Sequence, residues 1–221
     1  MARVAGVKEK LHMPLYDALY VPETAPGNTL GAVIGTGNIA RFFVDVQGKT
    51  KLETNLQASG VLPSQNSYEA RALRVVASPV RERRLEEGGT FGVEFLEALI
   101  YNSVTTLLVG EKVMIEMPTF WFPAGAGVSL AAGNGWPDPT ATFRFAEPVT
   151  IEPQQNFRVE MQFPLGVTNV KIPSGPVTTT TSGTPETTTT TLAEAKASLA
   201  DVPGPLRIWV ILDGYLTRDV Q

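Results

Sequence analysis

The stretch Phe157-Arg-Val-Glu-Met-Gln-Phe163 decides the fold class of this chain. Its apolar residues alternate strictly with polar ones, the apolar set being Phe157, Val159, Met161 and Phe163 and the polar set Arg158, Glu160 and Gln162. Successive side chains of a β-strand point to opposite faces, so a period of two predicts a strand with one face in a core and the other in water.

Further strands are expected on both sides of this one, because β-branched and aromatic runs recur between Gly and Pro residues. They cover Ile39–Val46, Lys51–Asn55, Tyr68–Ser78, a hairpin over Thr105–Pro118 that turns at Gly110-Glu111, Thr142–Phe145, Val149–Ile151 and Leu206–Leu212. Asp213-Gly214 is expected to turn the chain into Tyr215–Arg218. One short helix is expected over Thr90–Asn102, where apolar residues repeat every three to four positions.

Short strands without regular strand–helix alternation disfavour a parallel α/β sheet. We therefore expect an all-β fold, a single jelly-roll β-sandwich of two antiparallel sheets in Greek-key order, with one short helix and long loops. Residues 1–38, rich in Pro and Gly, are expected to be an N-terminal arm, and residues 39–221 the jelly-roll domain. Residues 178–191 hold ten Thr, which predicts an exposed, extended loop over about 174–204.

Composition excludes several kinds of chemistry. The 221 residues include no Cys and a single His, His12, so a thiolate nucleophile, a Cys-ligated metal or a His-rich metal site is excluded. The net charge of −4 comes without a basic stripe, which argues against sequence-specific nucleic-acid binding. No apolar run reaches the roughly 20 residues that span a bilayer, and the N-terminus is too polar for a signal peptide, so the protein is expected to be made in a cytoplasm and either kept there or released by lysis.

One motif favours a different function. Gly35-Thr-Gly37-Asn-Ile-Ala40 matches the G-x-G-x-x-A fingerprint, and Glu53 lies near the position of a ribose-binding acid, so a dinucleotide-dependent oxidoreductase is an alternative. The residues that should form the following helix, 39–47, favour a strand instead. The carboxylate pairs Glu86/Glu87 and Glu94/Glu97 are explained by a charged loop and a helix N-terminus, and His12 by a contact of the arm.

Aromatic residues supply the remaining candidates. Phe120-Trp121-Phe122 is typical of a core or a subunit interface, and we take it, with Trp136 and Trp209, as the candidate interface or anchor set. The same stretch could line a sugar-binding groove, which makes a lectin-like carbohydrate-binding module the second alternative. No catalytic, cofactor-binding or metal-binding residue is expected.

Several stretches together resemble the jelly-roll major capsid proteins of tailless icosahedral bacterial viruses, including those with an internal membrane. They are the helix leading into the hairpin Thr105–Met117, Pro118 with Phe122-Pro-Ala-Gly-Ala-Gly127, the segment Pro148–Phe157 before the alternating strand, and Trp209–Gly214. Many such proteins carry two jelly rolls, whereas 221 residues leave room for one.

The resemblance implies a structural protein rather than an enzyme, with no cofactor. Its partners would be copies of itself in trimeric or hexameric capsomers, other virion proteins and, in some members, an internal membrane. It would be made in the host cytoplasm and located in the virion. Residues 1–38 would then form an arm that ties neighbouring subunits together or faces the inside of the shell, while 174–204 would form an outward-facing loop.

Overall fold

The structure is a computed structural model that describes residues 8–22, 30–34, 38–79, 99–123, 142–163, 170–173, 178–182, 187–191, 194–197 and 205–219. Within these ranges the chain is mostly β-strand, and the helical parts are α1 (Leu30–Ile34), the 3₁₀ turn η1 (Thr119–Trp121) and residues 99–101. The expected all-β sandwich of two antiparallel sheets is confirmed. The predicted helix over 90–102 lies largely outside the described residues, and only its C-terminal end is seen.

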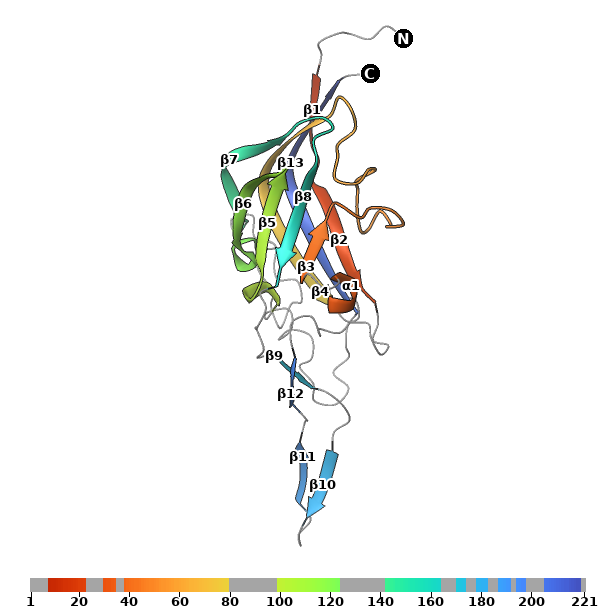
Figure 1. The fold of residues 1–221 in the computed structure, drawn as a ribbon, viewed down its shortest axis with the longest axis vertical. Helices are drawn as coiled ribbons and strands as arrows, with labels where there is room; N and C mark the ends of the chain where they lie inside the picture. Colours follow the sequence, from red (N-terminus) through yellow and green to blue (C-terminus); the bar gives the residue numbers. More distant parts are fainter. Residues whose placement is uncertain are drawn as a thin grey trace.

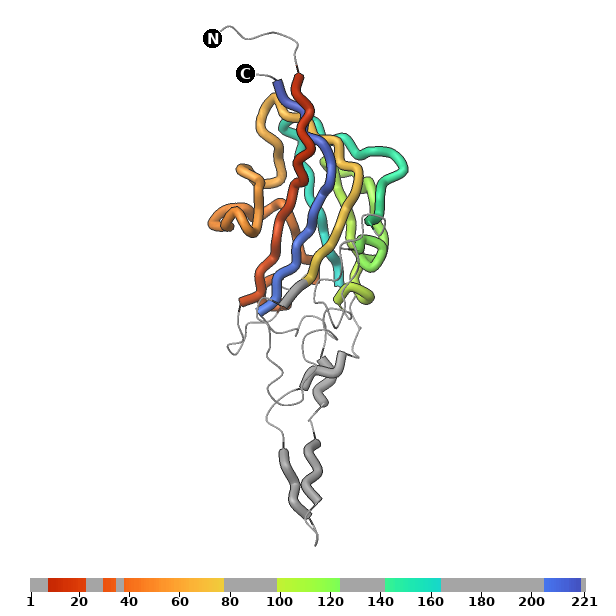
Figure 2. Tube along the Cα trace, turned by 180° about the vertical axis from the view of Figure 1, so that it is seen from behind, coloured from red at the N-terminus to blue at the C-terminus, as the bar shows by residue number. Residues whose placement is uncertain are grey.

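The first sheet is built around β13 (Leu206–Asp219), which is paired along both edges. One edge carries β1 (Lys8–His12) and then β2 (Leu15–Val21), and the other carries β4 (Ser67–Pro79), to which β7 (Arg144–Ile151) is added. Figure 2 shows β1 and β2 in red, β13 in blue and β4 in yellow lying side by side. Lys8 faces Asp219, so the first and last described residues are neighbours.

The second sheet has the order β3 (Ile39–Phe42), β8 (Phe157–Gln162), β5 (Val104–Val109) and β6 (Lys112–Pro118). In β8 the residues Phe157, Val159 and Met161 are buried while the residues between them are partly exposed, which confirms the period-two prediction. The hairpin of β5 and β6 is confirmed too, with Gly110 at a φ of 61° in its turn.

Strand pairing is nested. If β1 and β2 are counted as one position along β13, the first strand pairs with the last, β3 with β8, β4 with β7, and β5 with β6. Figure 1 shows the two sheets as two layers. Their facing sides form one core, to which the first sheet contributes Leu73, Val75 and Val210, and the second sheet Phe42, Leu107 and Met161.

Two small ladders account for the described part of the Thr-rich region. β9 (Val170–Pro173) pairs with β12 (Glu194–Ala197), and β10 (Thr178–Ser182) pairs with β11 (Thr187–Thr191), both antiparallel. The backbone expected to be an extended loop is therefore paired at these positions. The exposure of this region stays a prediction.

The N-terminal arm is corrected in its central part. Residues 8–21 form β1 and β2, and Leu15, Ala18 and Val21 are buried, because β13 offers this segment a complete edge of backbone hydrogen bonds. The segments 1–7 and 23–29 lie outside the described residues.

The turn predicted at Asp213-Gly214 is wrong, because strand β13 continues through both residues. The register shifts there, which marks a β-bulge. A Cβ at position 214 would overlap the backbone oxygen of Glu69 on β4, so only glycine lets the two strands approach this closely.

Two expectations for residues 39–55 are also wrong. The strand predicted to reach Val46 ends at Phe42, because Phe43 has a φ of 68° and redirects the chain. Residues 51–53 form a turn, which is stabilised by a 2.9 Å hydrogen bond from the Thr50 amide to the Glu53 carboxylate. The helix that a dinucleotide fingerprint requires after Gly37 is replaced by β3, and the residues before Gly35, where the fingerprint requires a strand, belong to α1.

Asp17 holds this redirected segment against the first sheet. Its side chain is fully buried on β2, and its carboxylate accepts hydrogen bonds from the Phe43 amide at 2.7 Å and from Lys49 Nζ at 2.8 and 2.9 Å. Next to it, Asn55 Oδ1 accepts from the Tyr16 amide and covers the outer edge of β2. A buried carboxylate is tolerated here because both of its oxygens accept hydrogen bonds.

Substitution Asp17→Ala should lower the free energy of unfolding by about 3–5 kcal/mol, because it leaves the Lys49 ammonium and the Phe43 amide without their acceptor. Urea denaturation measures this. Glu9→Gln, which removes the exposed 2.7 Å ion pair with Arg218, is the matched control and should cost less than about 1 kcal/mol. Equal losses in the two variants would contradict this role of Asp17.

Candidate functional site

An aromatic cluster lies where the chain leaves β6. It consists of Tyr101, Phe120, Trp121, Phe122, Phe143 and Phe145. The rings of Tyr101 and Phe120 stack with centroids 5.7 Å apart, and Trp121 meets Phe143 edge-on at 6.5 Å. Aromatic pairs attract each other at these separations, so the rings form one connected group.

The cluster has an inner and an outer part. Phe122 is 1% exposed and packs edge-on against Phe143 at 5.4 Å, so it is an anchor in the core. Tyr101, Phe120 and Trp121 are 67, 43 and 51% exposed. We call these three residues the aromatic platform. The free energy of association is favourable when a partner removes exposed aromatic surface from water. The platform is therefore a candidate interface.

Buried hydroxyl groups fix the platform in place. The Thr119 hydroxyl, at the start of η1, lies 2.7 Å from the Ser103 hydroxyl and 2.8 Å from that of Thr105. Thr119 also donates its amide to Ser103 O at 2.9 Å, and Phe122 O accepts from the Val75 amide of β4 at 3.0 Å. η1 is thus bonded to both sheets, so Phe120 and Trp121 are held on rigid backbone.

Strand β6 borders the platform and is an edge strand, because within the described residues it pairs only with β5. Three features discourage another strand from adding to its free edge: exposed charges at Lys112 and Glu116, Pro118 at its end, and a register shift opposite Leu107 and Leu108. Contact with a partner at this flank would therefore be made by side chains.

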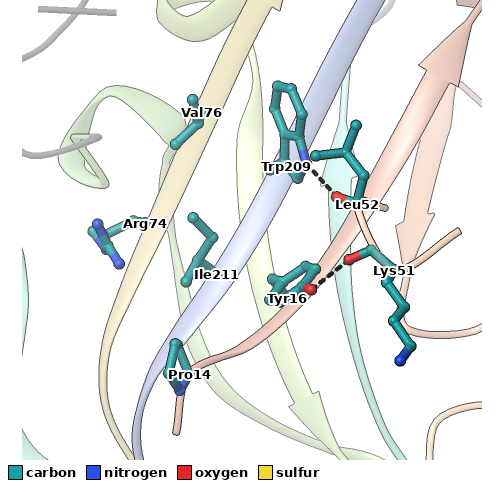
Figure 3. Close-up of a pocket in the computed structure, with 8 residues that line it drawn as sticks. All are labelled: Pro14, Tyr16, Lys51, Leu52, Arg74, Val76, Trp209 and Ile211. Atoms are coloured by element: carbon teal, nitrogen blue, oxygen red, sulfur yellow. Dashed lines mark hydrogen bonds between the residues drawn. The ribbon is translucent and has the colours of Figure 1, made fainter. Parts of the chain in front are cut away.

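A second surface of interest is the outer face of the first sheet, shown in Figure 3. A shallow hollow of about 450 Å³ is lined there by Pro14, Tyr16, Lys51, Leu52, Arg74, Val76, Trp209 and Ile211. It spans two neighbouring rows of paired residues across β2, β13 and β4, one row through Ile211 and the other through Trp209. We call it the outer-face hollow.

Two hydrogen bonds shape the hollow. Tyr16 donates its hydroxyl to Lys51 O at 2.5 Å, and Trp209 Nε1 donates to Leu52 O at 3.2 Å. Both bonds hold residues 51–52 against the sheet, where they form one side of the hollow. The Leu52 side chain is 62% exposed. With their polar atoms used in this way, the two aromatic side chains present mainly apolar surface.

Cations lie over aromatic rings along the same face. The Arg207 guanidinium lies 5.0 Å from the Tyr20 ring and 5.4 Å from that of Trp209. Towards the other end of β13, Lys10 and Arg71 lie 4.8 and 4.9 Å from the Tyr215 ring. Cation–π contacts of this kind order the side chains of an exposed sheet face.

The structure separates the candidate residues chosen from the sequence. Phe120 and Trp121 belong to the platform, Phe122 to the core and Trp209 to the outer-face hollow, while Trp136 lies outside the described residues. Tyr16, Tyr20 and Arg207 were missed. The alternation of Arg207, Trp209 and Ile211 with buried neighbours along β13 was the available signal, but Tyr16 and Tyr20 fell in the segment assigned to the arm.

Among the described residues, no group of three or more His, Asp or Glu could hold a metal ion. His12 packs against Tyr215 with centroids 5.4 Å apart. Hydrogen bonds from Lys10 and Arg71 hold the pKa of the Glu69 carboxyl below its usual range. This carboxylate therefore acts in ion pairs at the surface. Glu86, Glu87, Glu94 and Glu97 lie outside the described residues.

Comparison with protein-family models, with curated proteins and with solved structures found no match. Among the helices of the described part, none combines the length and the apolar character needed to cross a bilayer.

Substitution Thr119→Val keeps the shape of the side chain but removes its hydroxyl, so the buried hydroxyls of Ser103 and Thr105 lose this hydrogen-bond partner, although Ser103 still donates to Leu99 O. The free energy of unfolding should fall by about 1–3 kcal/mol in urea titrations. Thr119→Ser keeps the hydroxyl and is the matched control, expected to lose less than the valine variant. A serine variant that loses as much as the valine variant would show that methyl packing, not the hydroxyl group, holds η1.

Proposed function

We propose that this protein is a structural subunit of a bacterial-virus capsid, a single jelly roll that self-assembles into an icosahedral shell. It acts through its surfaces, without catalysis and without a cofactor. The observation that carries the proposal is an all-β sandwich with nested strand pairing that displays an exposed platform of Tyr101, Phe120 and Trp121.

Nested pairing supports the jelly-roll assignment. A jelly roll consists of eight strands in two Greek keys, which wrap so that the first strand lies beside the last. In the order β2-β13-β4-β7 of one sheet and β3-β8-β5-β6 of the other, the first strands lie beside the last, β13, which supports this assignment. Such sandwiches occur in capsids and in lectins, so the fold alone does not decide between these two functions.

The exposed surface favours assembly. Tyr and Trp are enriched at the centres of protein interfaces, where they bury large areas at a small cost in side-chain entropy. Only 18% of the residues are charged, below the roughly 25% of average proteins, as suits a protein whose surface is partly covered by neighbours. The charges, the proline and the register shift of β6 disfavour the addition of further strands to its free edge. Assembly would therefore proceed through repeated side-chain contacts that close into a ring or shell.

The partners follow from this proposal. Copies of the chain would form trimeric or hexameric capsomers, which would contact other virion proteins and, in a membrane-containing particle, the lipid beneath the shell. The protein would be made in the host cytoplasm and end in the virion. No sequence-specific contact with nucleic acid is proposed.

Substitution Trp121→Ser should weaken assembly of the purified chain, because it removes the largest ring of the platform from the interface. Loss of an interfacial Trp typically costs 2 kcal/mol or more, a change of about 30-fold or more in each contact. Light scattering and negative-stain electron microscopy measure the particles. Val44→Ser removes a 37% exposed apolar side chain outside the platform and should leave assembly unchanged. Particles that form equally well with serine at position 121 would contradict this role of the platform.

A carbohydrate-binding module is the second candidate, favoured by the half-exposed rings of Phe120 and Trp121, which could stack on sugar faces. This function predicts a small oligomer that binds glycans and loses binding on Trp121→Ala. A glycan array probed with the wild-type chain tests it. Glycan binding without assembly would favour this candidate over the capsid subunit.

A further inference from the structure

The outer-face hollow has the composition of a binding hot spot. Trp, Tyr and Arg are the residue types enriched where interface energy concentrates, and Trp209, Tyr16 and Arg74 line the hollow together. Ile211 and Val76 on the sheet and Leu52 at the rim add aliphatic surface to this lining. Such a surface suits a large apolar group with few hydrogen-bonding needs.

The aromatic platform is a group of this kind on the same molecule. Phe120 and Trp121 are adjacent in sequence, both are half-exposed, and η1 holds both on fixed backbone. The platform lies beside β5, β6 and β7 and is bonded to the edge of β4 through Phe122, whereas the hollow lies on the outer face of β2, β13 and β4 and is walled by residues 51–52. The two surfaces therefore belong to different parts of the sandwich.

Charges around the two surfaces are complementary. Lys51 and Arg74 line the hollow; Arg74 is paired with Asp213 at 2.6 Å, while Lys51 is exposed and has no ion pair within the described residues. Glu116 precedes Phe120 by four positions on β6, is exposed, and likewise lacks an ion pair to any described residue. A carboxylate on the strand that leads into the platform and an ammonium at the hollow would attract each other across an interface.

From these observations we infer that the platform of one copy docks into the outer-face hollow of a second copy. The inference rests on the proposed function and names the contact through which copies join. Because the two patches differ, the contact is heterologous: each copy offers a platform to one neighbour and a hollow to another. Repetition of such a contact closes a ring when the rotation between copies allows it, as a trimeric or hexameric capsomer requires.

A mixing experiment with two complementary variants tests the contact. The platform variant, Phe120→Ser with Trp121→Ser, retains an intact hollow. The hollow variant, Leu52→Glu, retains an intact platform and places a charge at the rim while leaving the Leu52 carbonyl available to Trp209. All three substituted side chains are at least 43% exposed, so both variants should fold, which circular dichroism and urea titration check.

One variant is immobilised through a terminal tag, and the binding of each soluble variant to it is measured. The immobilised platform variant should bind the hollow variant at least about 30-fold more tightly than it binds itself, because only the mixed pair joins an intact platform to an intact hollow. The hollow variant should show the same preference in the reverse arrangement. In light scattering the mixture should form dimers but no rings. Each mixed dimer has used its one intact platform and its one intact hollow, so only the substituted surfaces remain free.

The outcomes separate the inference from the proposed function. Wild-type particles without any preference for the mixed pair would overturn the inference and leave the capsid proposal intact. Self-association of the hollow variant through its own platform, at wild-type strength, would overturn it as well, because the contact would then join two like patches. A wild-type chain that remains monomeric would overturn the capsid proposal itself. Val44→Ser, outside both surfaces, should assemble like wild type.

Discussion

Strand β13 hydrogen-bonds along both of its edges, and the rest of the sandwich depends on this double pairing. It joins β1 and β2, from the start of the described chain, to β4, which in turn carries β7. The partners of β13 are separated from it by more than a hundred residues in sequence, as the Leu212–Leu73 and Leu212–Leu15 rungs illustrate. Contacts this distant close large loops, so the sheet should form late and cooperatively rather than by local steps.

The same strand divides the molecule into a core side and an outer side. Leu206, Ile208, Val210 and Leu212 face the second sheet, while Arg207, Trp209 and Ile211 face away from it. On the inward side Tyr68 donates its hydroxyl to Leu212 O at 2.6 Å, and burial raises the pKa of that phenol, so the group stays neutral. The inner face of β13 is used for stability, whereas its outer face remains open to partners.

Two local patterns of sequence predicted their elements correctly. The alternation in β8 and the hairpin at Gly110 depend on neighbouring residues alone, and both are confirmed. Features that depend on distant partners were not predictable in this way. Gly214 sits in a bulge and not in a turn because β4 approaches it, and residues 8–21 are strands because β13 accepts them, although the surrounding Pro and Gly suggested an irregular arm. The outer-face hollow was missed for the same reason, since it needs β2, β4 and β13 side by side.

Sedimentation velocity of the purified wild-type chain over a wide range of concentration and salt tests the central claim most directly. If the nested sandwich is a shell subunit, the chain should populate a discrete ring or closed particle that grows at the expense of the monomer as concentration rises. A single monomer boundary at every concentration and salt would contradict the account.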